Sequence, residues 1–260
     1  MTAIVNAEWT PPLGESFRSK TMRVLLLLVI LMTCSCTKDQ AGDPLDDAKR
    51  FSNEGKFERA LQKHIWLHDH VLEDRPGYRG VRLSFALAEW VELGKKYPKA
   101  LEALKDIRNK KTTRLLDGER QRDLFNDVES INDYLGESKA TVELFKKIEA
   151  AQPEFATSIY DLADEALVEA GEFALAKKYL GDPAARLSTA QRNFERGIQH
   201  SKTSPMGEAS QRAFEGIFTD EILRIIAVLN NTGARDQARQ IQSAALNVLD
   251  NPAIRGAIKD

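Results

Sequence analysis

Apolar residues recur every three or four positions from Asp43 onward, which is the spacing of one face of an α-helix. Residues 57–71 show the pattern most clearly, because seven of their side chains fall on one face. These are Phe57, Ala60, Leu61, His64, Leu67, His68 and Val71. No run alternates between apolar and polar residues as a half-exposed strand does. The pattern therefore predicts an all-α domain over residues 43–260.

Three places along the chain carry a typical helix-start signal, a capping residue followed by proline. They are Asp43-Pro44, Asp182-Pro183 and Ser204-Pro205. Proline is tolerated in the first turn because its missing N–H has no helical acceptor there. We therefore expect helices to begin at these three points.

A short joint of glycine followed by alanine recurs five times between the predicted helices. The glycines are Gly55, Gly94, Gly136, Gly171 and Gly233, and the alanines are Ala60, Ala100, Ala140, Ala176 and Ala238. The alanines are 40, 40, 36 and 62 residues apart, and a period in this range is typical of stacked helical hairpins. We expect each glycine to end one helix in a left-handed turn, and each alanine to let the next helix pack closely.

The joints resemble those of the tetratricopeptide repeat. The likeness is strongest in residues 47–67, at Ala48, Phe57, Ala60 and Leu67, and in residues 85–107, at Leu87, Ala88, Tyr97, Ala100 and Leu104. It covers about residues 40–252, except for residues 186–220, which lack a clear joint and are interpreted as an inserted helical pair. The resemblance implies a TPR-like α-solenoid of antiparallel helical hairpins.

A solenoid of this kind binds proteins or peptides on a concave surface, formed mostly by the first helix of each hairpin. The resemblance places five candidate partner-binding residues there: Lys49, Asn53, Arg82, Phe85 and Glu89. They do not form the lysine and asparagine carboxylate clamp of the chaperone-binding members. The resemblance therefore implies a protein partner without naming it.

The segment before the predicted domain has the features of an export signal. Nine apolar residues, 24–32, follow Lys20 and Arg23. The run is shorter than the roughly 20 residues that span a bilayer, but it has the length of a signal-peptide core. An ordinary signal would begin at Met22, so Met22 is an alternative start. The expected organisation is a signal peptide at 1–34, a linker at 35–42 and the repeat domain at 43–260.

Both cysteines of the chain, Cys34 and Cys36, follow this apolar run. The sequence resembles a bacterial lipobox, with Leu31 three residues before Cys34, so Cys34 is the predicted lipidation site. Cys36 is the alternative, because Ser35 is the small residue that usually precedes the lipidated cysteine. The resemblance implies a lipid-anchored protein of the bacterial cell envelope with its folded domain outside the cytoplasm. A plain secreted protein is the other interpretation.

Charge gives no sign of a nucleic-acid partner. The formal net charge of the 260 residues is −2, and no block of like charge stands out. Because both cysteines precede residue 43, a disulfide framework is not expected in the predicted domain.

Three of the four histidines lie within residues 60–71. His64 and His68 are four residues apart, a spacing that can place two imidazoles on one metal ion. They also lie on the apolar stripe, which favours packing between helices over a metal or ligand site. Trp66 and His70 lie on the opposite face, and we expect Trp66 to pack against Trp90 or a partner.

Enzyme motifs are missing from the sequence, which has no GxxxxGK[ST], GxSxG or HExxH pattern. Asp161 and Asp164 are interpreted as a solvated helix face. We therefore predict no catalytic residue and no cofactor. The predicted function is a membrane-anchored scaffold for protein–protein interaction, and the alternative is a small-molecule or metal-binding envelope protein that uses His64 and His68.

Overall fold

The computed structural model describes residues 42–203 and 207–258. These residues form α-helices and one short 3₁₀ helix without any strand, which confirms the all-α prediction. The elements are α2 (Pro44–Asn53), α3 (Phe57–Asp74), η2 (Pro76–Tyr78), α4 (Arg79–Arg82), α5 (Phe85–Lys96), α6 (Pro98–Leu116), α7 (Arg122–Leu135), α8 (Ser138–Ala151), α9 (Pro153–Glu169), α10 (Phe173–Tyr179), α11 (Pro183–Ser201), α12 (Gly207–Asn231), α13 (Arg235–Val248) and α14 (Pro252–Arg255).

Two of the three predicted helix starts are confirmed. A carboxylate oxygen of Asp43 accepts a hydrogen bond from the backbone N–H of Leu45 at 2.8 Å, and Asp182 caps Ala184 in the same way at 3.0 Å. Each carboxylate satisfies an N–H that has no acceptor within its helix. The third predicted start, Ser204-Pro205, falls outside the described residues.

Four of the five joint glycines adopt the left-handed conformation that was expected. Gly55, Gly136, Gly171 and Gly233 have φ values between 71° and 78°, which side chains with a Cβ rarely adopt. The prediction for Gly94 was wrong, because this residue lies inside α5. A Cβ at Gly94 would approach Cβ of Leu101 to 3.0 Å, so this glycine serves the close approach of α5 and α6.

The joint alanines lie where helices cross. Ala60, Ala100, Ala176 and Ala238 are completely buried, as expected. Ala140 is only half-buried, so the expected close packing is weaker at that joint.

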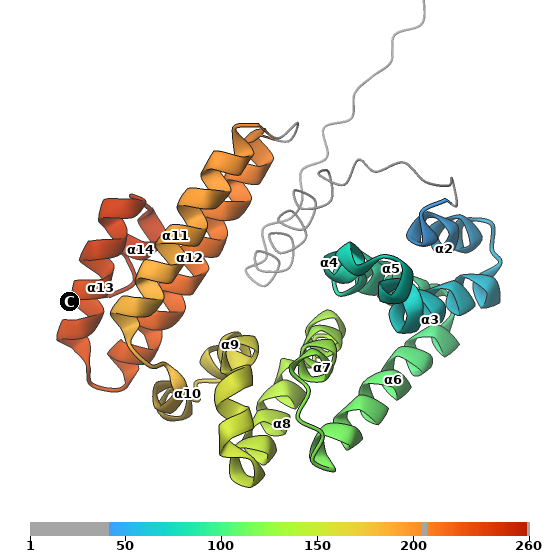
Figure 1. Cartoon of the computed structure of the whole chain (residues 1–260), viewed down its shortest axis with the longest axis horizontal. Coiled ribbons are helices and arrows are strands. Elements are labelled where there is room, and N and C mark those ends of the chain that lie inside the picture. Colours follow the sequence, from blue (N-terminus) through green and yellow to red (C-terminus); the bar gives the residue numbers. More distant parts are fainter. Residues whose placement is uncertain (1–41, 204–206, 259–260) are drawn as a thin grey trace, which may run out of the picture.

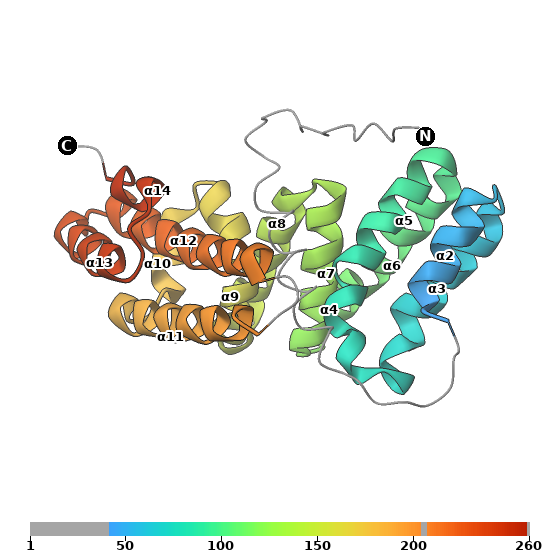
Figure 2. The ribbon, with the colours of Figure 1, turned by 90° about the horizontal axis from the view of Figure 1, so that it is seen from above.

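Helices that follow one another in the chain pack against one another: α2 on α3, α5 on α6, α8 on α9, α11 on α12 and α12 on α13. Figure 1 shows that they follow an open arc, with α2 and α3 at one end and α13 and α14 at the other. Figure 2, turned by 90°, places the same elements at the two ends.

The stretch 186–220, in which no joint was found, belongs to a long antiparallel pair. It lies in α11 and α12, which pack closely along their length. Gly197 makes this approach possible, because a Cβ there would lie 2.2 Å from the ring of Phe214. The expectation of a helical pair is therefore confirmed, within the residues described.

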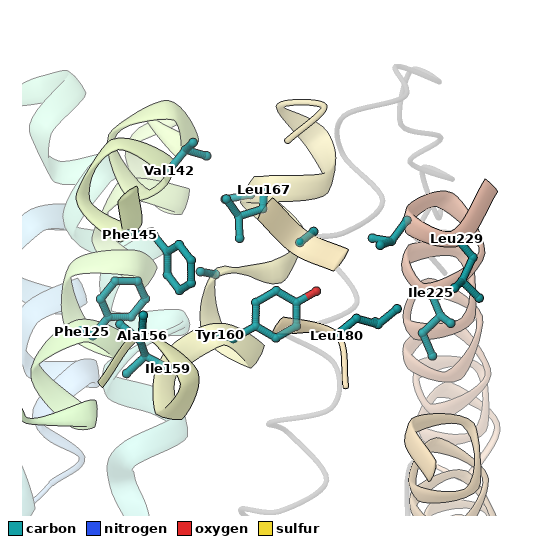
Figure 3. Packing of buried hydrophobic residues seen from close by; sticks show 14 of the residues in the cluster. Phe125, Val142, Phe145, Ala156, Ile159, Tyr160, Leu167, Leu180, Ile225 and Leu229 are labelled. Atoms are coloured by element: carbon teal, nitrogen blue, oxygen red, sulfur yellow. The ribbon is translucent and has the colours of Figure 1, made fainter. Parts of the chain in front are cut away.

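The largest apolar core runs from the end of α6 through α7–α13 to α14. Figure 3 shows its middle, where Tyr160 and Leu180 lie between Phe145 on one side and Ile225 and Leu229 of α12 on the other. Two smaller clusters hold the α2–α7 end together. The arc is thus built on a series of neighbouring cores.

Candidate functional site

His64 is part of the packing between α3 and α5. Its side chain is buried, and its ring stacks on that of Trp90 with centroids 5.4 Å apart. Trp90 is fixed in turn, because its Nε1–H donates to the carbonyl of Ala100 at 2.8 Å. Burial, and then the positive charge of Lys49, lower the pKa of His64 to about 4. The imidazole is therefore neutral over the ordinary pH range.

His68 lies one turn further along α3 and is also buried, with its ring edge-on to Trp90 at 6.2 Å. Neither ring nitrogen has a hydrogen-bond partner, and Nε2 is 3.9 Å from Oδ2 of Asp127. Burial, followed by the charges of Lys111 and Arg82, lowers its pKa to about 3 against the opposing effect of Asp127. The interpretation of both histidines as packed side chains agrees with these positions.

Arg82 was predicted to face a partner, and this prediction was wrong. Its side chain is buried, because the guanidinium forms two hydrogen bonds with the carboxylate of Asp127 and a third with the carbonyl of His68. Lys111 binds the same carboxylate. Burial alone would raise the pKa of Asp127, but the two cations outweigh it and hold the pKa below its usual value.

Metal binding gains no support from this cluster. Among the described residues, no group of three or more His, Cys, Asp or Glu side chains is arranged to hold a metal ion. The carboxylate next to His68 is already engaged by two cations, Arg82 and Lys111. Neither His64 nor His68 lines the two grooves described below.

The other four predicted partner-binding residues lie on two neighbouring helices, Lys49 and Asn53 on α2 and Phe85 and Glu89 on α5. Lys49 and Glu89 are half-exposed and pair with each other at 3.2 Å, so they tie α2 to α5. Phe85 is half-buried against a small apolar cluster, and Asn53 is exposed at the end of α2. Lys49, Glu89 and Phe85 therefore contribute to packing between the first helices.

An open groove of about 1160 Å³ lies on the outer side of α2 and α3 and is called the α2–α3 groove. It is lined by Gly42, Pro44, Asp47, Phe51, Arg59, Gln62, Lys63, Trp66, Asp74 and Arg75. Trp66 is 39% exposed and, with Leu116, is one of two large apolar side chains exposed in the described part of the chain. Trp90 packs on the two histidines, so the predicted packing of Trp66 on Trp90 is not seen.

A second groove, of about 800 Å³, lies between α9, α10 and the long α11–α12 pair and is called the α9–α12 groove. Its walls carry aromatic rings and small polar side chains, a combination that sequence periodicity did not single out. The lining includes Thr157, Tyr160, Tyr179, Thr189, Asn193, Phe194 and Phe214. Figure 3 shows Tyr160 extending from α9 toward α12.

Three charged residues that line the α9–α12 groove, Arg186, Glu221 and Arg224, belong to an internally paired cluster with Asp164. Asp164 accepts a hydrogen bond from Arg186 at 2.7 Å and lies 3.5 Å from Nε of Arg224, and Glu221 pairs with both arginines. Asp164 was interpreted as solvated, and this was wrong, because it is 4% exposed. Burial raises its pKa despite the two arginines.

Within the part of the chain that the structure describes, no helix combines the length and apolar character needed to cross a membrane. The predicted signal segment, Met22, Cys34 and Cys36 lie outside the described residues.

Comparison with known proteins assigns no family. No protein-family model matches the chain, and a search of curated proteins also finds no match.

Proposed function

We propose that the protein is a lipid-anchored, TPR-like helical scaffold that binds a partner protein in the bacterial cell envelope. The solenoid interpretation is supported by the recurring joints, since Gly55, Gly136, Gly171 and Gly233 share a positive φ, and three of the alanines that follow them, Ala60, Ala176 and Ala238, are completely buried. Repeats of this type commonly present extended surfaces for proteins. The proposal at this level is an analogy of architecture.

The observation that carries partner binding is the α9–α12 groove. Arg186 and Arg224 are neutralised from within by Asp164 and Glu221, so these two arginines have little free charge to offer a ligand. What remains is aromatic surface with hydroxyl and amide groups around it, together with the carboxylates of Asp161 and Asp182. Such a groove suits a peptide segment that presents apolar side chains and hydrogen-bonds through its backbone.

The envelope location is supported by the sequence. The apolar run 24–32 and the lipobox-like residues around Cys34 predict an anchor, and residues 35–42 then form a short linker to α2. We propose no catalytic role, because the charged clusters around Asp127 and Asp164 are buried and internally paired.

Two neighbouring residues of α11 allow a matched test of the groove. Thr189 and Ser188 are both exposed, and each hydroxyl donates to a carbonyl one turn earlier in its own helix. Only Thr189 lines the groove. Thr189→Arg should therefore fill the groove with a long charged side chain, whereas Ser188→Arg should leave it open.

The experiment is an affinity purification of the full chain from detergent-solubilised envelope, with wild type and the two variants side by side. We expect at least one co-purifying protein that Thr189→Arg loses and Ser188→Arg retains. If no protein co-purifies, or if both variants lose it equally, partner binding in the α9–α12 groove is wrong.

A further inference from the structure

On the exposed face of α3, charged residues of opposite sign lie at equal distances before and after the tryptophan. Arg59, Trp66 and Glu73 are seven residues apart, so at 1.5 Å per residue the charged positions lie about 10.5 Å before and after Trp66. Seven residues correspond to nearly two helical turns, which places all three side chains within about 20° of one line. All three are exposed.

Other charged residues on the same face also have positive charge before Trp66 and negative charge after it. Lys63 adds a second cation before Trp66, and Asp69 adds a second anion after it. The stripe is therefore cationic in its first half, aromatic at its centre and anionic in its second half. A stripe of this kind is complementary to an antiparallel copy of itself and is mismatched with a parallel copy.

The position of α3 in the fold leaves most of this face open, although α2 contacts its first half, where Asp47 pairs with Lys63 at 3.5 Å and the guanidinium of Arg59 lies over the ring of Phe51. The α2–α3 pair forms one end of the arc, as Figures 1 and 2 show, and α3 packs on α5 through its other side. End units of stacked repeats usually present a polar outer face. Here Trp66 lies in the middle of that face, beside the α2–α3 groove and its apolar wall at Phe51.

We propose that two copies of this chain associate through their α3 helices, antiparallel about a two-fold axis at Trp66. The axis sets Trp66 against Trp66 of the second copy, and each tryptophan covers the other's α2–α3 groove. It also sets Arg59 opposite Glu73 of the second copy, and Gln62 beside its Asp69. Each of these charge contacts occurs twice, because a two-fold interface repeats every pair.

The interface uses α2 and α3 of each copy, and association depends on the two symmetric charged contacts. This inference goes beyond the proposed function, because the α9–α12 groove lies on other helices.

The test is site-specific photo-crosslinking in the full chain, with a benzophenone amino acid at Gln62, which is exposed and next to Trp66 on the stripe. The matched control probe replaces Leu116, the other exposed large apolar side chain. We expect a product with twice the 29.1 kDa mass of the chain from the Gln62 probe and none from the Leu116 probe.

Charge reversal then tests the register. Arg59→Glu or Glu73→Arg alone should weaken association about tenfold, because like charges then meet at two symmetric contacts. The double variant Arg59→Glu with Glu73→Arg should restore the product, since both partners are reversed together. Lys147→Glu, at an exposed position of α8, should change nothing.

Three results overturn the proposal. One is the absence of a double-mass product, including the case in which the Gln62 probe captures a protein of another mass. The second is a double-mass product that the single reversals leave unchanged, and the third is a double variant that fails to restore it. None of these results bears on partner binding in the α9–α12 groove, because the comparison of Thr189→Arg with Ser188→Arg tests that binding separately.

Discussion

The ring of His64 stacks on the ring of Trp90, with centroids 5.4 Å and planes 26° apart. His68 meets the same indole edge-on, so two imidazoles and one indole fill the space between α3 and α5. Charging either imidazole in this setting is costly, because water is excluded and cations lie nearby, Lys49 for His64 and Lys111 and Arg82 for His68. The two histidines therefore pack as neutral side chains, and they make the stability of the fold sensitive to acid.

The first prediction follows from this sensitivity. In the folded chain the pKa of His64 is about 4 and that of His68 about 3, whereas in the unfolded chain both are near 6.5. Between these values the unfolded chain binds protons that the folded chain excludes, so the free energy of unfolding falls as pH drops through 6.5. The loss between pH 7.5 and pH 5 should be about 2 kcal/mol for each imidazole.

Urea unfolding at the two pH values measures this loss, with His64→Leu as the matched comparison. The variant lacks one titrating group, so it should lose about 2 kcal/mol less than wild type over the same interval. Equal losses in both proteins would show that His64 is not held neutral in the folded state.

The second prediction concerns Asp127, the only carboxylate that the structure places between Arg82 and Lys111 within the described residues. Asp127→Asn leaves the buried Arg82 and the half-buried Lys111 without this counter-charge, and it should cost about 3 kcal/mol of stability. Asp161→Asn is the control, because Asp161 pairs with Arg122 on the exposed surface and should cost about 1 kcal/mol or less. Chemical denaturation of the two variants compares them, and a similar cost for both would contradict the burial of the Asp127 cluster.

Sequence pattern predicted the local features of the fold and failed where distant helices meet. The helical class, the caps at Asp43 and Asp182 and the burial of His64 all depend on neighbours within a few turns. Arg82 and Asp127 are 45 residues apart, so the periodicity of either helix gives no sign of their pairing. Charged residues were read as surface because charges are rarely buried without a partner.

The same reason explains the errors at Asp164 and Gly94. Asp164 is buried because Arg186 and Arg224 approach it from two later helices, which no local pattern reveals. Gly94 was grouped with the joint glycines by its place before an alanine, but α5 continues past it to Lys96, and its missing side chain leaves room for Leu101 of the next helix. The α9–α12 groove was missed for a related reason, since its residues come from four helices.

The third prediction tests the joints in a single helix. Ala176 of α10 is completely buried, whereas Ala174, two residues earlier, is exposed. Ala176→Leu should overpack the contact of α10 with its neighbours and lower stability by about 1 to 3 kcal/mol. Ala174→Leu should change stability by less than about 0.5 kcal/mol. Thermal melts of the two variants give the comparison, and coincident melting temperatures would mean that Ala176 is not at a tightly packed crossing.

The last prediction concerns the anchor, which lies outside the described residues. Cys34→Ser removes the predicted lipidation site, so the protein should move from the membrane fraction to the soluble fraction of the envelope. The shift should be large, because each buried CH₂ of a lipid chain contributes about 0.8 kcal/mol to membrane affinity. Cys36→Ser is the matched control and should leave the protein in the membrane fraction. The reverse result would assign the lipid to Cys36, and a double variant that stays with the membrane would reject the lipid anchor altogether.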